Sequence, residues 1–211
     1  MEKCLCCGAE GGGYLCERCG VILPPGEVDY FALFSLPRRF GIDEGILKEK
    51  YFALSRLFHP DAHVQDPPEI QEAALRWSAL LNNAYQTLKD QAKRFRYLLS
   101  LEIGWDQEGA GQLSIAHFEL MERLQGALDL KDEAEKAGRL ENIRAEVQAE
   151  QEGIERNLEE LTARFDALED RDGGAKEAIL EAIKAKLQEH SYTKRMLTLI
   201  DEPEMVSRFH W

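Results

Sequence analysis

Four of the five cysteines in this 211-residue chain are spaced as the ligands of a metal ion would be. All five lie within the first nineteen residues, where two Cys-x-x-Cys pairs are separated by eight residues. Such pairs suit a tetrahedral site in which each pair forms one knuckle. A glycine follows each pair and tolerates the left-handed backbone that brings amide groups to the thiolates. We therefore predict a centre formed by Cys4, Cys7, Cys16 and Cys19, with Cys6 left over.

Zinc is the ion that this set of ligands favours. Four thiolates leave no open coordination position for water, so the ion is expected to be structural and not catalytic. The segment 1–26 holds few apolar residues and needs such an ion in order to fold. An odd number of cysteines is a poor disulfide framework in a reducing compartment. An iron–sulfur cluster is the main alternative, and redox-active cysteines are a weaker one.

The tripeptide His59-Pro60-Asp61 is the second candidate site. Alone it is a weak signal, because chance produces it in on the order of one chain in a hundred of this length, and it also suits a plain surface turn. Its context is more informative, because it lies between two amphipathic helical patterns. The apolar stripe of the first is Leu47, Tyr51, Leu54 and Phe58. This helix must end at Phe58, because Pro60 disfavours helix at the residue before it.

Helical periodicity continues through the middle of the chain, and no strand alternation is convincing after residue 26, so the body is predicted to be all-α. Asp43 is the expected cap of the second helix. Asp66 is the expected cap of the third, because it stands three residues before Glu69 and a proline follows near the first turn. Further helices are expected over residues 29–36 and 93–101, before glycines at 104, 109 and 111 that mark a linker.

The last part of the chain predicts a long helix that folds back on a second one. Apolar residues recur at intervals of seven along the first of these, as in a coiled-coil seam. They are Leu140, Val147, Ile154, Leu161 and Leu168. The pair Gly173-Gly174 is expected to break this helix before a return helix begins. With a shorter helical stretch around Phe118, a three-helix bundle is the simplest architecture.

The composition limits the classes of function. The net charge of -13 argues against broad contact with nucleic acid or with anionic membranes. No run of about twenty apolar residues is present, so we expect no membrane-spanning helix. The N-terminus resembles neither a signal peptide nor an Arg-rich presequence, so the expected location is cytoplasmic. The isolated histidines are not expected to bind a metal.

Five stretches of the chain carry a resemblance to a known family. They are Asp29-Tyr30-Phe31-Ala32-Leu33-Phe34, Leu36-Pro37, Phe58-His59-Pro60-Asp61, Asn83-Ala84-Tyr85-Gln86-Thr87-Leu88 and Tyr97-Leu98-Leu99-Ser100-Leu101. The helical hairpin with its HPD tip resembles the J domain. Most of residues 29–200 is similar to HscB, the J-protein of iron–sulfur cluster assembly. The cysteine-rich N-terminus resembles the tetracysteine extension of some members of that family.

The resemblance implies that the HPD loop binds an ATPase chaperone of the DnaK/HscA type. Lys48, Lys50 and Arg56 lie on the helix before the loop and are candidate charges for docking on an acidic chaperone surface. The alternative is that these three are ordinary solvated charges near Glu44 and Glu49, which contribute little to binding.

The resemblance also implies that the C-terminal bundle binds an IscU-type scaffold protein, on which the cluster is built. The contact patch carries over to Leu120, Met121 and Leu124 on the first bundle helix and to Met196 on the last. Met196 stands where family members often place an aromatic residue, and its offset from the apolar stripe favours exposure. Acidic residues expected just after Leu124 are here Gln125 and Leu128. Without the resemblance, Leu124 and Leu128 would be assigned to the core.

The sequence thus predicts a non-enzymatic co-chaperone, since it shows no nucleotide-binding loop and no nucleophile–base pair. Its three parts are a small metal-binding domain of zinc-knuckle or ribbon type (1–26), a J domain (27–104) and a three-helix bundle (112–211). It would stimulate the chaperone ATPase and deliver the scaffold during cluster assembly and transfer. One alternative is a general J-domain co-chaperone for unfolded clients with a structural zinc domain. Another is a zinc-ribbon adaptor with a coiled-coil tail, which the acidic charge disfavours.

Overall fold

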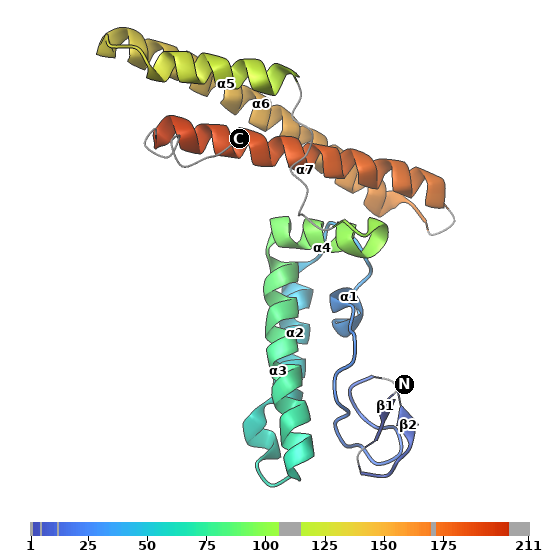
Figure 1. The fold of residues 1–211 in the computed structure, drawn as a ribbon. Coiled ribbons are helices and arrows are strands. Elements are labelled where there is room, and N and C mark those ends of the chain that lie inside the picture. The colour runs from blue at the N-terminus through green and yellow to red at the C-terminus, as the bar shows by residue number, and fades with distance from the viewer. Residues whose placement is uncertain (1, 5, 12, 106–114, 170–171, 203–211) are drawn as a thin grey trace. The chain divides into compact units, whose positions relative to one another are not determined.

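The computed structural model describes residues 2–4, 6–11, 13–105, 115–169 and 172–202 (Figure 1). Nearly all regular structure in these residues is helical, which confirms the predicted all-α class. The chain divides into two compact units, Met1–Leu98 and Leu99–Trp211. The first unit holds both the cysteine-rich segment and the helical hairpin. Within the described ranges, no helix is both long enough and apolar enough to cross a membrane.

Two short hairpins build the cysteine-rich segment. In the first, strand β1 (Glu2–Lys3) pairs antiparallel with β2 (Glu10–Gly11). In the second, an isolated antiparallel bridge joins Leu15 to Ile22. Each hairpin therefore encloses one Cys-x-x-Cys pair.

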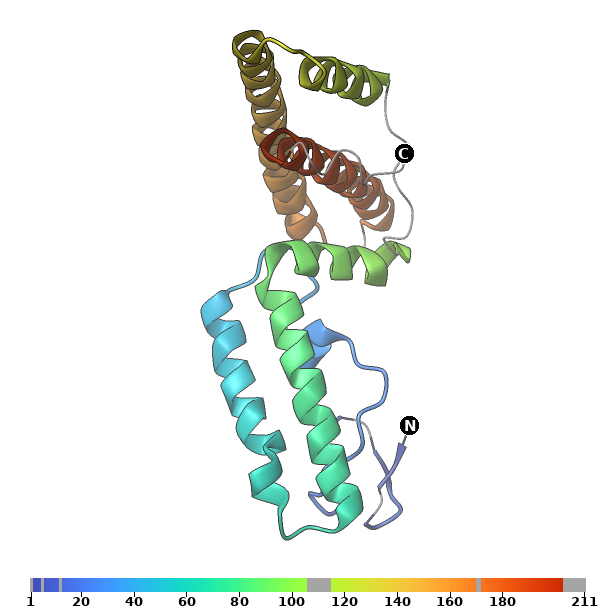
Figure 2. The same ribbon diagram turned by 60° about the vertical axis from the view of Figure 1, so that its left-hand side comes forward.

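Helices α2 (Glu44–Phe58) and α3 (Pro68–Lys89) form a helical hairpin, joined through the 3-10 turn η1 (Pro60–His63). The two helices lie side by side in Figures 1 and 2. Asp43 caps α2 as predicted, because its Oδ1 accepts a hydrogen bond from the amide of Ile46 at 3.0 Å. The helix also ends at Phe58 as predicted, where the backbone of His59 becomes extended.

The helices on either side of this hairpin differ in length from the prediction. Helix α1 covers Tyr30–Leu33 and not 29–36, because Ser35 adopts a left-handed backbone with φ of 48°. Helix α4 covers Gln91–Ile103 and so extends beyond 93–101 at both ends. Its early start follows from Asp90, whose Oδ1 accepts a hydrogen bond from the amide of residue 93 at 2.9 Å.

The expected cap of α3 was wrong. The residue before the helix is Pro67, and no side chain caps this end. Asp66 is not available for capping because its carboxylate pairs with His63, with 2.7 Å between Oδ2 and Nδ1. Pro68 does occupy the first helical position, where its missing amide hydrogen costs no helical hydrogen bond.

The second unit contains helices α5 (Ile115–Leu128), α6 (Glu133–Ala167) and α7 (Gly173–Asp201). All three contribute to one buried cluster, in agreement with the predicted bundle. Its members are Leu120, Leu124, Ala127, Ile143, Val147, Tyr192, Met196, Leu199 and Ile200. Helix α5 is much shorter than its two partners, so this shared core joins the first part of α6 to the last part of α7.

The predicted break at Gly173-Gly174 was wrong, because these glycines form the first turn of α7. The long helix ends earlier, at Ala167, and Leu168 has extended backbone angles. The Asp172 carboxylate then accepts a hydrogen bond from the amide of Glu169 at 3.2 Å. The long helix therefore ends before the glycine pair is reached.

Candidate functional site

Four thiol groups converge in the cysteine-rich segment. The Sγ atoms of Cys4, Cys7, Cys16 and Cys19 all lie within 4.8 Å of one another. Two separations link the knuckles, 3.5 Å from Cys4 to Cys19 and 3.6 Å from Cys7 to Cys16. A single ion bound at about 2.3 Å by four sulfur atoms holds them about 3.8 Å apart. The residues present therefore fit one tetrahedral metal ion.

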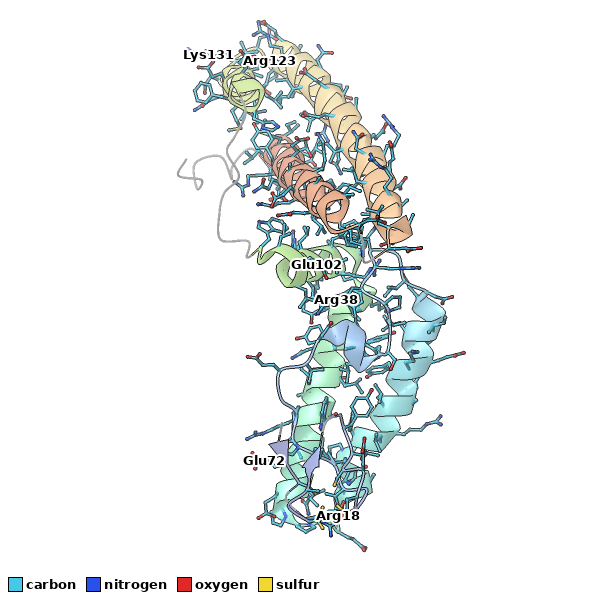
Figure 3. All side chains as sticks on the ribbon, turned by 90° about the vertical axis from the view of Figure 1, so that its right-hand side faces the viewer. Arg18, Arg38, Glu72, Glu102, Arg123 and Lys131 are labelled. Atoms are coloured by element: carbon cyan, nitrogen blue, oxygen red, sulfur yellow. The ribbon has the colours of Figure 1, made fainter. Side chains whose placement is uncertain are left out.

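The fifth cysteine stands outside this group. Cys6 is exposed, whereas Cys4 and Cys16 are buried. In Figure 3 sulfur atoms lie beside the labelled Arg18, in the knuckle between Cys16 and Cys19. An iron–sulfur cluster places several iron and sulfide atoms between its thiolates and spreads them further than one ion does. The close spacing therefore favours a centre with a single metal ion.

The two knuckles have the same backbone pattern. The amide of Cys4 donates to the carbonyl of Ala9 at 2.8 Å, and the amide of Gly8 donates back to the Cys4 carbonyl at 2.9 Å. Cys16 and Gly20 repeat this arrangement in the second knuckle. Gly8 and Gly20 have φ of 69° and 73°, the left-handed conformation predicted for them.

The pKa values of Cys4 and Cys19 are shifted in opposite directions. A hydrogen bond from the amide of Cys7 lowers the pKa of Cys4 to about 6, although burial raises it. For Cys19 the amide of Val21 also lowers the pKa, but burial and the neighbouring thiols outweigh it and raise the pKa to about 12. Four thiolates at this spacing repel one another. The group is therefore suited to release its protons when a cation binds.

The HPD loop lies at the tip of the hairpin, where α2 ends and η1 begins. The Nδ1 atom of His59 accepts a hydrogen bond from the amide of Asp61 at 3.2 Å, and it lies 3.7 Å from the Asp61 carboxylate. The two side chains are 55% and 87% exposed. Pro60 fixes the first position of the turn. The side chains of the loop are therefore open to solvent and not part of a core.

A second histidine holds the base of this loop. The Nε2 atom of His63 lies 2.9 Å from the carbonyl oxygen of Leu57, in the last turn of α2. Its Nδ1 pairs with Asp66, just before α3. The Leu57 carbonyl raises the pKa of His63, burial opposes this effect, and Asp66 adds to the rise. Sequence reasoning missed this role, although an aspartate three residues after the histidine was a usable signal.

Two of the three candidate basic residues on α2 are exposed, and the third makes a hydrogen bond within the protein. Lys48 and Arg56 are exposed, and their role in docking stays a prediction. The ammonium group of Lys50 instead donates to the carbonyl of Ser35 at 2.9 Å, so it braces the turn after α1. Phe52 lies one helical turn from both Lys48 and Arg56 and is 51% exposed. Sequence reasoning did not single out this aromatic side chain.

The predicted exposure of the scaffold patch was wrong for three of its four residues. Leu120, Leu124 and Met196 are 5%, 1% and 0% exposed, because all three lie in the buried core that α5, α6 and α7 share. Met121 is partly buried at the edge of the same cluster. Phe118, one turn before it on α5, is 63% exposed. The role of the patch in scaffold binding stays a prediction, with Met121 as its member at the surface.

The region around the HPD loop matches a known family in sequence. Residues 29–97 match the DnaJ domain family. A co-chaperone protein HscB homolog from Ralstonia nicotianae is 36% identical over 114 residues, which are 54% of this chain and 64% of that protein. The match thus spans just under two thirds of the length of that relative.

The fold is similar to solved structures along nearly the whole chain. The crystal structure of human co-chaperone protein HscB has a TM-score of 0.67 and 25% identity, with 97% of this chain and 99% of that one covered. The chaperone HscB from Vibrio cholerae has a TM-score of 0.53 and 25% identity, with coverage of 84% and 98%.

Proposed function

We propose that this chain, whose residues 29–97 match the DnaJ domain family and which is similar to HscB co-chaperones in sequence and fold, stimulates the ATPase of a DnaK/HscA-type chaperone. One observation carries the proposal. His59-Pro60-Asp61 forms the exposed tip of the hairpin of α2 and α3, inside the region that matches the DnaJ domain. The chain is proposed to be a partner and not an enzyme, because the hydrolysis takes place on the chaperone.

The loop presents a donor and an acceptor side by side. In the neutral ring of His59, an Nδ1 that accepts the Asp61 amide leaves the proton on Nε2. The ring therefore offers an N–H donor next to the exposed carboxylate of Asp61. A chaperone surface with a matching acceptor and a cationic side chain would engage both groups at once.

Helix α2 extends this contact away from the loop. Lys48, Phe52 and Arg56 lie on successive turns and are all exposed. The two cations would accelerate encounter with an acidic surface, and the ring between them would add apolar contact area once the surfaces meet. The docking surface of the proposal is therefore the HPD loop together with these three side chains.

The second unit is proposed to bind an IscU-type scaffold protein and to deliver it to the chaperone. The likeness to HscB structures over most of the chain supports this part of the proposal. Met121 and Phe118 are the side chains of α5 that such a partner could reach. The buried residues Leu120, Leu124 and Met196 would act through the packing that fixes the position of α5.

We further propose that the metal ion is zinc and that its role is structural. Four thiolates and a single tetrahedral position match the preference of zinc and leave no site for substrate. Cys4, Cys7, Cys16 and Cys19 would hold the ion. A cytoplasmic location, where thiols stay reduced, is consistent with this state of the cysteines.

Single-turnover ATP hydrolysis by a DnaK/HscA-type chaperone tests the proposal. Faster hydrolysis with the chain alone would support the J-protein function, and a further increase with an IscU-type scaffold would support delivery. If an unfolded client peptide increased hydrolysis as much as the scaffold does, a general co-chaperone would be the better description. Absence of stimulation in every case would overturn the proposal.

A further inference from the structure

The second cysteine knuckle is joined to the helical hairpin through two residues at its base. The amide of Leu23 donates to the carbonyl of Tyr14 at 2.9 Å, and the bridge between Leu15 and Ile22 lies just inside this pair. Cys16 follows next along the chain, and its amide bonds to the carbonyl of residue 21 at 2.8 Å. A short ladder therefore connects the thiol of Cys16 to the pair of Tyr14 and Leu23.

This pair packs on two aromatic side chains of the hairpin. The Tyr14 ring meets the rings of Phe58 and Trp77 edge-on, each with 5.7 Å between centroids. Phe58 and Trp77 stack on each other at 5.0 Å with nearly parallel planes. The indole Nε1 of Trp77 donates to the carbonyl of Leu23 at 2.6 Å. The Tyr14 hydroxyl donates to the carbonyl of Leu33 at 3.0 Å, which also fixes the ring to the end of α1.

The position of these contacts relative to the HPD loop is informative. Phe58 is the last residue of α2 and is directly followed by His59. Its side chain is fully buried, and Trp77 is 3% exposed. Because one face of Phe58 rests on Trp77 and Tyr14 meets it edge-on, the cysteine segment contributes part of the packing that holds the last turn of α2.

The cysteine segment depends on its thiols for its own fold. Its buried cluster contains Cys4, Cys16 and Leu23, with Cys7 and Ala9 packed at the edge. Three of these five residues are cysteines, so few other apolar contacts remain if the thiols separate. Small domains of this kind gain their folding free energy from the bound ion. Loss of the ion would therefore release Tyr14 and Leu23 from their fixed positions.

We propose that metal occupancy of the tetracysteine centre controls how the HPD loop is presented, with Tyr14 as the positioning residue that connects the centre to Phe58. Filled, the centre holds Tyr14 against Phe58 and Trp77, and α2 keeps its last turn. Empty, the knuckle loosens, the last turn of α2 frays, and the backbone from 57 to 62 opens more often. The expected effect of this opening on chaperone stimulation depends on the proposed function. The expected change in the backbone opening of the loop does not depend on it.

Backbone hydrogen exchange over residues 57–62 measures the change directly. Zinc-loaded protein is compared with protein stripped by a chelator, and we expect exchange to be faster by roughly fivefold or more without the ion. Cys16→Ser should show the fast exchange at any zinc concentration. Cys6→Ser is the matched control, because it removes an exposed thiol outside the group and should behave as wild type. Equal exchange in loaded and stripped wild type would overturn the proposal.

Variants of Tyr14 separate positioning from simple metal binding. Tyr14→Ala keeps all four thiols and the backbone bond to Leu23, so it should still bind one zinc. Its loop should exchange fast in both states, with the response to the chelator lost. Tyr14→Phe keeps the ring contacts and should retain most of the response. A Tyr14→Ala protein that responds to the chelator as strongly as wild type would show that Tyr14 does not carry the coupling.

Chaperone assays on the same samples keep the two proposals apart. If zinc-loaded wild type fails to stimulate ATP hydrolysis, the proposed function fails, whatever the exchange shows. If loaded protein stimulates and stripped protein exchanges no faster at the loop, the coupling fails and the proposed function stands. Circular dichroism of each variant checks that its total helix content matches that of wild type.

Discussion

His63 and Asp66 form a pair at the base of the HPD loop, with 2.7 Å between Nδ1 and Oδ2. The other ring nitrogen of His63 lies 2.9 Å from the carbonyl of Leu57. A protonated ring donates to both partners, whereas a neutral ring can donate to only one of them. The protonated form therefore ties the end of α2 to the residues before α3.

This geometry predicts a pH dependence. The Leu57 carbonyl, with help from Asp66 and against burial, raises the pKa of His63 above its usual value of about 6.5. A group with a raised folded-state pKa gives its stability in full below the unfolded pKa and loses it as the pH rises through the folded pKa. We expect the melting temperature of wild type to exceed that of His63→Gln most in mildly acidic buffer, with the difference shrinking as the pH rises. An NMR titration that placed the pKa of His63 below 6.5 would contradict this account.

His59→Gln should abolish chaperone stimulation with little change in stability. The side chain is more than half exposed, and its one hydrogen bond to the amide of Asp61 is local. Single-turnover ATPase assays and thermal melting measure the two effects. His190→Gln is the matched control. His190 pairs with Glu155 at the surface of the other unit, so this variant should keep full stimulation. Clear stimulation by a well-folded His59→Gln protein would remove the basis of the J-protein assignment.

The purified protein should contain one zinc ion per chain. Cobalt in its place should give the thiolate charge-transfer absorption of a tetrahedral tetrathiolate site. Cys16→Ser should release the ion and unfold the first 26 residues or so, while the protein keeps most of its helical circular dichroism. Iron–sulfur absorption from protein purified without oxygen would show that the centre holds a cluster instead.

The charges of α2 should affect binding unequally. Lys48→Ala with Arg56→Ala should slow association with the chaperone several-fold at low salt, and the difference from wild type should disappear as salt screens the charges. Lys50→Ala should leave the rate closer to wild type and mainly loosen the turn at Ser35, because its ammonium group is already engaged there. Stopped-flow binding at several salt concentrations separates the variants. Equal rates for all of them in low salt would show that these charges are only solvated.

Burial divides the scaffold patch into two kinds of residue. Leu124→Ala should lower the free energy of unfolding of the second unit by about 2–5 kcal/mol, because it leaves a cavity in the shared core. Met121→Ala and Phe118→Ala should leave stability nearly unchanged and weaken scaffold binding, with about tenfold lost for each 1.4 kcal/mol. Calorimetric binding and thermal melting give the two readouts. If both surface variants bound the scaffold as tightly as wild type, the scaffold site would not include Met121 or Phe118.

Local features of the sequence were enough to predict much of the first unit. The cap at Asp43, the end of α2 at Phe58 and the left-handed glycines after each cysteine pair depend on residues close in sequence, and the structure shows all three. The convergence of four thiols follows from their spacing and from the strong preference of such pairs for one ion.

Features that depend on distant residues were not predictable in this way. Asp66 matches the pattern of a helix cap, but His63 takes its carboxylate. Met196 lies off the predicted apolar stripe of α7, yet it is buried in the core that the three helices share. Tyr14 looks like an ordinary residue between glycine and leucine, and its role comes from Phe58 and Trp77, which lie far along the chain. In each case a tertiary contact decides what a side chain does.

Because Cys6 lies apart from the other four cysteines, the number of reactive thiols reports whether the metal centre is filled. In the filled centre four sulfur atoms are held as metal ligands, and Cys6 is the remaining cysteine of the five. An alkylating reagent should therefore label one position in filled protein and as many as five in empty protein, which a mass spectrum resolves molecule by molecule. Alkylation in living cells, before lysis, would record the proportions of filled and empty protein in the cell.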